Sequence, residues 1–393
     1  MPWDALSEEQ RELRDLVRQL ARERIAPRAA EIDASHEFPW DVVELFREND
    51  IFGLFFTEEY GGLGTGTLLS LIAIEEVGKV CATSALILAV QELGSLGLKL
   101  AGSDEQKERY LPRLASGEWL PAYALTESGS GSDSAAMRTK ARRDGDEYVL
   151  DGSKRFITNA GVANLYTVFA KTEPEAGHDG ISAFLVEAEA PGFAVARLEP
   201  KMGISGSTTG ELTFDDCRIP AENLLGEEGE GFRIAMRILD RSRPGVAAQA
   251  LGIAQGATDY ALEYSKTRET MGKPIGQHQL IQAKLADMET ECEAARGLLH
   301  RYGRMADEGV KGPELTKASA MAKLKCGDVA MWVTTEAVQI LGGYGYIKEY
   351  PVERFMRDAK ITQIYEGTQE IQRLVIAREM LKESRAFLLA GVA

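Results

Sequence analysis

Residues 144–152 read Asp-Gly-Asp-Glu-Tyr-Val-Leu-Asp-Gly, which indicates a β-rich segment in the middle of the chain. Asp144-Gly145-Asp146 and Asp151-Gly152 are turn signals, and the apolar run 148–150 between them is strand-like. Further strand-like runs follow at short intervals, at residues 155–158, 165–170, 181–186, 193–198 and 212–214. No helical crossover separates these runs, so we expect an antiparallel sheet or barrel over residues 121–229 rather than a βαβ fold.

Helical patterns lie before this strand-rich part, over residues 1–120. Ser7 with Gln10, and Ser103 with Gln106, have the spacing of capping boxes at helix starts. Pro39 is expected to begin another helix. Longer helices are predicted around residues 67–80 and 84–101, after a tight loop over 59–64.

Residues 230–393 are expected to form a helical bundle. One predicted helix carries apolar residues at alternating steps of four and three, which is typical of a bundle seam: Ile281, Leu285, Met288, Cys292, Ala295, Leu299 and Tyr302. Pro313 suits the first turn of the next helix, which we expect to continue to about residue 340. The chain therefore divides into a helical domain (1–120), a β domain (121–229) and a second helical domain (230–393).

The composition excludes several classes of function. The formal net charge of −16 argues against nucleic-acid binding, because a phosphate backbone needs a basic face. Apolar runs such as 84–90 are too short to span a membrane, and residues 1–4 do not resemble a signal peptide, so we expect a cytoplasmic protein with no membrane span. No GxGxxG motif supports a Rossmann cofactor site. The scattered cysteines and histidines indicate no metal site; buried core thiols are the expectation for Cys81, Cys217, Cys292 and Cys326.

Three separated motifs resemble those of the acyl-CoA dehydrogenase family. Residues 124–133 read ALTESGSGSD, residues 339–346 read QILGGYGY with Glu349, Arg354 and Asp358 downstream, and residues 364–368 read IYEGT. The motifs stand in the family's order, and the resemblance covers nearly the whole chain. It implies an α+β, mainly α fold: a helical domain, a β-barrel and a four-helix bundle. It also implies an FAD-dependent oxidoreductase of short-, medium- or branched-chain type that converts a saturated acyl-CoA to a trans-2-enoyl-CoA.

The resemblance makes Glu366 the base that takes the substrate's α-proton, while the β-hydrogen leaves as hydride to flavin N5. Burial beside an acyl chain should raise the pKa of this carboxyl group toward a useful range. A carboxylate stabilised by the dipole of the following helix is the alternative interpretation. Some relatives carry the base on an earlier helix, immediately before an Arg, but that position is Ser242 here.

The resemblance also implies contacts to substrate and cofactor. The substrate-binding residues would be Ser132, Asp240, Arg243, Tyr365 and Gly367, with a solvated charge pair as the alternative for Asp240 and Arg243. The FAD-binding residues would be Tyr123, Ala124, Leu125, Thr126, Gly131, Ser132, Phe156, Ile157, Thr158, Arg268, His278, Gln279, Gln339, Ile340, Leu341, Gly342, Gly343, Thr368, Gln369 and Glu370. Their alternative interpretations are a Gly/Ser turn, a plain strand, helix ends and, for Thr368, a helix cap.

The family pattern implies further partners. An electron-transfer flavoprotein would accept the electrons, and the chain would form a homotetramer because the Arg268 and Gly343 regions often serve the FAD of a neighbouring subunit. The expected setting is fatty-acid β-oxidation within lipid metabolism, with short to medium saturated acyl chains as substrates. The alternatives are an acyl-CoA oxidase that uses oxygen and a non-catalytic acyl-CoA-binding flavoprotein. A decarboxylating enzyme for glutaryl-CoA is disfavoured because such enzymes need a cation at the far end of the acyl pocket, and the segment expected there, residues 80–98, contains no Lys or Arg.

Overall fold

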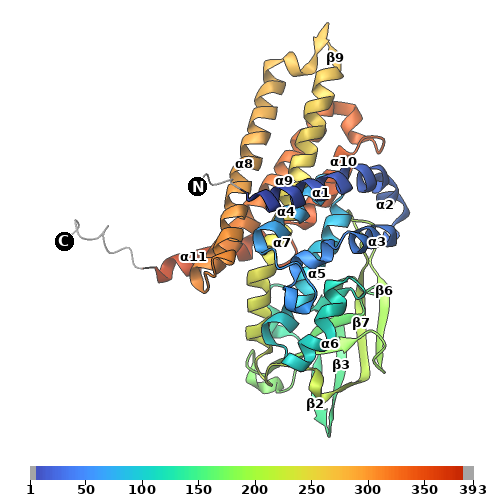
Figure 1. Ribbon diagram of the computed structural model, residues 1–393, viewed down its shortest axis with the longest axis vertical. Coiled ribbons are helices and arrows are strands. Elements are labelled where there is room, and N and C mark those ends of the chain that lie inside the picture. Colours follow the sequence, from blue (N-terminus) through green and yellow to red (C-terminus); the bar gives the residue numbers. More distant parts are fainter. Residues whose placement is uncertain (1–5, 384–393) are drawn as a thin grey trace, which may run out of the picture.

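The computed structural model describes residues 6–383. Its first part is helical and lies beside the long C-terminal helices (Figure 1). The helices are α1 (Glu8–Leu20), α2 (Ala29–Ser35), α3 (Trp40–Glu48), α4 (Thr67–Gly78), α5 (Ala82–Ala101) and α6 (Asp104–Ala115). Both predicted capping boxes are confirmed: Ser7 Oγ accepts from the Gln10 N–H and Ser103 Oγ from the Gln106 N–H, at 3.1 and 3.2 Å. Helix α3 begins directly after Pro39, as expected.

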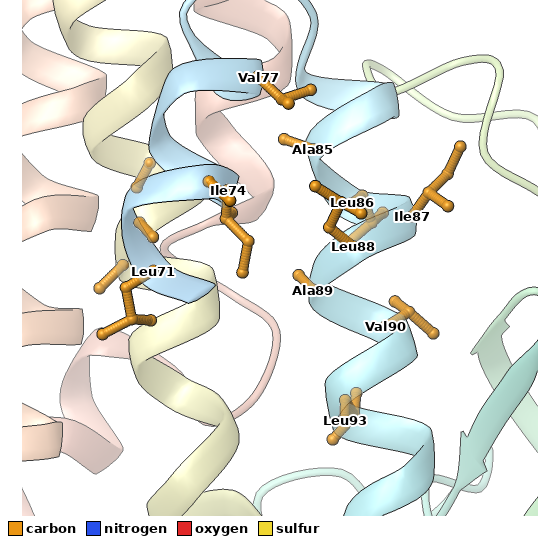
Figure 2. Packing of buried hydrophobic residues seen from close by; sticks show 14 of the residues in the cluster. Leu71, Ile74, Val77, Ala85, Leu86, Ile87, Leu88, Ala89, Val90 and Leu93 are labelled. Atoms are coloured by element: carbon orange, nitrogen blue, oxygen red, sulfur yellow. The ribbon is translucent and has the colours of Figure 1, made fainter. Parts of the chain in front are cut away.

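Helices α4 and α5 belong to the larger of the two apolar clusters in the described part of the chain, and both pack against α7. Figure 2 shows Ala85 and Ala89 of α5 facing α4, while Ile87 and Val90 point away from it. Because α5 is apolar on nearly every side, it must be covered on every side. Helix α5 is long and apolar enough to match a membrane span by length and composition, but 78% of its apolar window is buried inside the protein.

The middle part of the chain forms an eight-stranded sheet. Its strands are β1 (Pro121–Ala124), β2 (Lys140–Asp144), β3 (Glu147–Thr158), β4 (Leu165–Lys171), β5 (Ile181–Glu187), β6 (Phe193–Leu198), β7 (Thr209–Pro220) and β8 (Leu224–Leu225). The order is β6-β7-β3-β2-β4-β5-β8, and β1 pairs with β4. Most neighbours are antiparallel, as predicted, whereas β1 and β4 run parallel and β2 meets β4 in parallel at one residue pair. Strands β1, β2 and β8 were not predicted.

The turn predicted at Asp151-Gly152 is wrong, because β3 continues through it. The pairing of β3 with β7 instead shifts register between Leu150 and Gly152, which is a β-bulge. Gly152 has φ +144°, and a Cβ at this position would come within 2.8 Å of the Thr139 Cα. Glycine is therefore required by a close backbone approach in a bulged strand rather than by a turn.

The last part of the chain is built on long helices. They are α7 (Gly231–Thr267), α8 (Gln279–Asp307), α9 (Pro313–Leu341), α10 (Val352–Ile361) and α11 (Gln369–Lys382), with a small hairpin of β9 (Glu269–Thr270) and β10 (Lys273–Pro274) that the sequence did not predict. The α8 seam is buried from Met288 to Tyr302, while Ile281 and Leu285 are partly covered at its start. Helix α9 has the predicted bounds to within one residue. The exact domain boundaries at 120/121 and 229/230 stay predictions.

Candidate active site

Glu366 lies in the turn between α10 and α11, and its backbone is left-handed. Its φ is +50° and that of Gly367 is +90°. A left-handed conformation costs a non-glycine residue about 1–2 kcal/mol, so other contacts must hold it. Gln372 Nε2 donates to the carbonyl oxygens of Glu366 and Gly367 at 3.3 and 2.9 Å, and Lys323 Nζ donates to that of Gly367 at 2.7 Å.

The Glu366 side chain reaches α7, where Ser242 Oγ donates to its Oε2 at 2.5 Å. The residue is only partly exposed, and its carboxyl group lies among buried side chains of α7 and α9. Loss of hydration raises the pKa of Glu366 above its ordinary value. The Ser242 hydrogen bond and the charges of Lys323 and Arg243 lower it, but burial prevails. A carboxyl group with a raised pKa is a better proton acceptor when ionised.

Arg243 and Tyr123 bring buried polar atoms to the same region. The Arg243 side chain is 5% exposed and its Nη1 donates to Asp240 Oδ1 at 2.8 Å. The alternative interpretation as a solvated charge pair is therefore wrong for Arg243, whereas the Asp240 side chain is 30% exposed. Arg243 Nε and the Tyr123 hydroxyl have no hydrogen-bond partner among the described residues. Burial raises the pKa of Tyr123, and the nearby Glu366 charge adds to that shift. Unpaired buried polar atoms are costly, and they are typical of surfaces that bind a ligand.

The remaining predicted substrate residues differ in position. The Tyr365 hydroxyl donates to Oε1 of the buried Gln249, which fixes the residue before Glu366 against α7. Ser132 and Gly131 are exposed in the loop after β1. That loop closes on itself through the Glu127–Ser130 bridge and a bond from Ser130 Oγ to the Asp133 carbonyl.

Two predicted flavin segments meet at the end of the sheet. Tyr123 and Ala124 end β1, Leu125 and Thr126 follow, and the Thr126 carbonyl accepts from the Arg155 N–H at 2.8 Å. This bond joins the segment to 156–158 at the end of β3. There, Ile157 is buried and Thr158 half-buried, whereas Phe156 is 58% exposed and left-handed, with φ +58°. A second register shift, between Lys154 and Ile157, turns the Phe156 ring outward.

A third cluster surrounds a cavity of about 460 Å³ at the far end of α7. Its predicted members are Arg268, Ile340, Leu341, Gly342 and Gly343, and the unpredicted ones include Tyr264 and Tyr344. The Arg268 guanidinium lies over the Tyr344 ring, 5.0 Å from its centre.

Three further predicted residues lie beside this cavity without lining it. His278 contacts Thr270, a lining residue, at 3.4 Å, while Gln279 and Gln339 are exposed at the ends of α8 and α9. The structure thus brings most of the predicted Arg268–Gly343 group together, but not beside Glu366. Ser242 lies within α7, and Arg268 is the C-cap of the same helix. A rise of 1.5 Å per residue puts about 40 Å of helix between them. Figure 1 shows the β9 hairpin at the opposite end of the molecule from the sheet.

Thr368 and Gln369, two of the three predicted cofactor residues after Glu366, make contacts within the protein. Thr368 caps α11, with Oγ1 accepting from the Ile371 N–H at 3.3 Å. Gln369 is buried, and its amide binds the Leu324 carbonyl, Asp328 and Lys323. Glu370 is exposed in the first turn of α11, where hydrogen bonding lowers its pKa.

Sequence reasoning missed the buried groups that support these segments. Lys154 is fully buried, and its Nζ donates to Glu127 Oε1 at 2.7 Å and to the Leu125 carbonyl at 3.1 Å, under the β1 loop. Lys323 and Gln372 are equally buried beneath the Glu366 turn. The sole signal for Lys323 was a lysine among small residues of a predicted helix, which does not reveal its partners.

Comparison with known proteins identifies the family of the chain. Family models described as the N-terminal, middle and C-terminal domains of acyl-CoA dehydrogenase match residues 7–118, 122–217 and 229–381. Cyclohexane-1-carbonyl-CoA dehydrogenase of Geobacter metallireducens is 50% identical over 380 residues, which cover 96% of this chain and 99% of that protein.

Solved structures agree with the sequence comparison. Butyryl-CoA dehydrogenase from Megasphaera elsdenii superposes with a TM-score of 0.93 at 45% identity, covering 96% of this chain and 99% of that one. A chain of a structure named for the electron transferring flavoprotein of Acidaminococcus fermentans gives 0.94 at 45% identity, covering 97% and 100%. The chain therefore belongs to the acyl-CoA dehydrogenase family, whose members are FAD-dependent oxidoreductases that act on acyl-CoA substrates.

Proposed function

We propose that this protein dehydrogenates a saturated acyl-CoA to trans-2-enoyl-CoA, with Glu366 as the base that takes the α-proton. The observation that carries the proposal is the setting of the Glu366 carboxyl group. A strained turn presents it to α7 beside Ser242, Arg243 and Tyr123, where two buried polar atoms have no hydrogen-bond partner within residues 6–383. A surface with such unpaired groups suits a polar ligand such as the thioester end of an acyl-CoA.

The chain's own residues support proton abstraction in three ways. Burial disfavours the charged form of Glu366, so the carboxylate gains more from accepting a proton than it would in water. Ser242 holds one carboxylate oxygen and so limits rotation of the side chain. The left-handed turn keeps the carboxyl group pointed at α7. The backbone N–H of Glu366 belongs to the same turn and would donate a hydrogen bond to the thioester oxygen of the substrate.

The residues present also fit FAD. A Cβ built on Gly342 or Gly343 would meet open space, and these glycines line the cavity where Arg268 could pair with a phosphate. At the other site, exposed Phe156 and half-buried Thr158 offer an apolar ring and a hydroxyl beside Thr126. When bound, FAD would accept the β-hydrogen as a hydride.

The distance between these two regions favours an oligomer. About 40 Å of α7 separates Arg268 from Ser242, which lies on the Glu366 side of the molecule near the Tyr123–Thr126 segment. One FAD molecule therefore cannot contact both Thr126 and Arg268 of a single chain. We therefore propose that the Arg268 cavity serves the FAD of a neighbouring copy, and that the protein is a homotetramer.

The electron acceptor we propose is an electron-transfer flavoprotein. The structural neighbour named for such a protein supports this partner. The proposed setting is cytoplasmic fatty-acid β-oxidation.

Anaerobic bleaching of the flavin by acyl-CoAs of increasing length tests the proposed reaction. The wild type should bleach, and Glu366→Gln should keep its FAD and bind acyl-CoA but bleach about 10²–10⁴-fold more slowly, the usual contribution of a general base. Glu263→Gln is the matched control, because Glu263 is an exposed carboxylate on α7. Near-normal bleaching of Glu366→Gln would overturn the assignment. Rapid reoxidation in air with product bound would instead favour an oxidase.

A further inference from the structure

The turn that carries Glu366 rests on a buried cation. Lys323 projects from α9 and has no exposed surface. Its Nζ donates two hydrogen bonds to this region, one to the Gly367 carbonyl at 2.7 Å and one to Gln369 Oε1 at 3.1 Å. A buried ammonium group is costly to desolvate, and an apolar side chain would pack against α11 without that cost. A lysine at this buried position therefore needs a reason beyond packing.

The geometry supplies such a reason. Glu366 and Gly367 are consecutive left-handed residues, a backbone arrangement that an unsupported turn would relax. Their carbonyl groups point into the protein, where Gln372 and Lys323 are their donors. If Lys323 were lost, the Gly367 carbonyl would lose its shortest hydrogen bond and the turn would be free to rotate the Glu366 carboxyl group away from Ser242.

The charge of Lys323 acts on the same carboxyl group. Charged groups face this amine from every neighbouring element: Glu366 in the turn, Glu370 on α11, Arg243 on α7 and Asp328 on α9 itself. Burial lowers the pKa of Lys323 itself to about 7, so the amine is a cation mainly below that pH. There it favours the ionised form of Glu366, while burial opposes it. Lys323 therefore acts on both the position and the ionisation of Glu366.

We propose that Lys323 is a positioning residue for the reaction: by holding the Gly367 carbonyl and the Gln369 amide from α9, it fixes the left-handed turn that aims Glu366 at the substrate. This inference rests on the proposed role of Glu366. It assigns to Lys323 no contact with substrate or cofactor.

Two variants separate the contributions of Lys323. Lys323→Met removes both the hydrogen bonds and the charge, whereas Lys323→Gln retains a donor for the Gly367 carbonyl without the charge. Lys325→Met is the matched control, since Lys325 lies two residues away on α9 and pairs with Glu291 at the surface. The rate of flavin reduction at saturating butyryl-CoA is measured from pH 5 to 9 by anaerobic stopped flow on the holoenzymes, with FAD content and thermal midpoint recorded for each.

For Lys323→Met we expect about 10–100-fold slower flavin reduction, the size of effect that misplacing a reacting group produces. The acid limb of its pH profile should move to higher pH, because the carboxylate has lost a favourable charge. Lys323→Gln should recover part of the rate but keep the displaced acid limb. Lys325→Met should behave as the wild type.

An unchanged rate and acid limb in Lys323→Met with full FAD content would overturn the proposal. So would loss of the fold or of FAD in both Lys323 variants, because the lysine would then serve core stability alone. Glu366→Gln, measured in parallel, keeps the two claims distinct. If that variant were active, the proposed function would fail; if it were inactive while Lys323→Met were normal, only the role of Lys323 would fail.

Discussion

Ser242 and Glu366 are 124 residues apart in the sequence, yet the Ser242 hydroxyl donates to the Glu366 carboxylate at 2.5 Å. The contact joins α7 to the turn before α11. The family resemblance places Ser242 where some relatives would carry the base; in this chain the residue instead hydrogen-bonds the proposed base. Removing the donor tests whether this support matters.

Ser242→Ala should shift the acid limb of the flavin-reduction profile to higher pH. The hydrogen bond stabilises the ionised carboxylate, so its loss raises the pKa of Glu366, and reduction then fails at a higher pH as the base becomes protonated. Stopped-flow measurement over pH 5–9 checks this shift. Thr258→Val, which removes another buried hydroxyl from α7, is the control; identical profiles for Ser242→Ala and the wild type would contradict the prediction.

Lys154→Met should destabilise the protein by about 3–5 kcal/mol, because it leaves the buried Glu127 carboxylate without its cation. Denaturant unfolding measures this loss. Lys140→Met, at an exposed position of β2, should change stability by less than about 0.5 kcal/mol. The double variant Glu127→Gln/Lys154→Met should be more stable than the sum of the losses measured for Glu127→Gln and Lys154→Met separately. If its loss of stability equalled that sum, the two residues would not be coupled.

Asp358→Asn should stabilise the protein increasingly as pH rises. Asp358 is buried and accepts from the Ile204 N–H, and burial raises its pKa to about 7. Because the folded-state pKa lies above the unfolded one, the wild type loses stability as pH rises from about 4 toward 7, whereas an asparagine does not titrate. Thermal midpoints at pH 5 and 8 should therefore show a larger gain for the variant at pH 8. Asp179→Asn, at an exposed site, should show no such trend.

Arg268→Ala should weaken FAD binding by about tenfold or more, since a charge-assisted hydrogen bond to a phosphate contributes roughly 1.5–3 kcal/mol. Titration of the apoprotein with FAD, followed by fluorescence, measures the change. Arg233→Ala removes an exposed guanidinium near the other end of α7 and should leave FAD affinity unchanged. Equal affinities for Arg268→Ala and the wild type would remove the Arg268 cavity from the cofactor site.

Features that depend on local chemistry were predictable from the sequence. Both capping boxes formed because their partners are three residues apart, and the α8 seam is buried from Met288 to Tyr302 because a helical period brings those residues to one face. The spaced motifs were sufficient to indicate the family and to single out Glu366.

Tertiary structure alone decided what lies under and around those motifs. Asp151-Gly152 has the composition of a turn, but pairing with β7 converts it to a bulge within β3. Lys154 meets Glu127, and Lys323 meets the Gly367 carbonyl, only because separate elements pack together. Such contacts are long-range and require buried charges, which no local spacing specifies; the fold must exist before Glu366 can be held, desolvated and aimed.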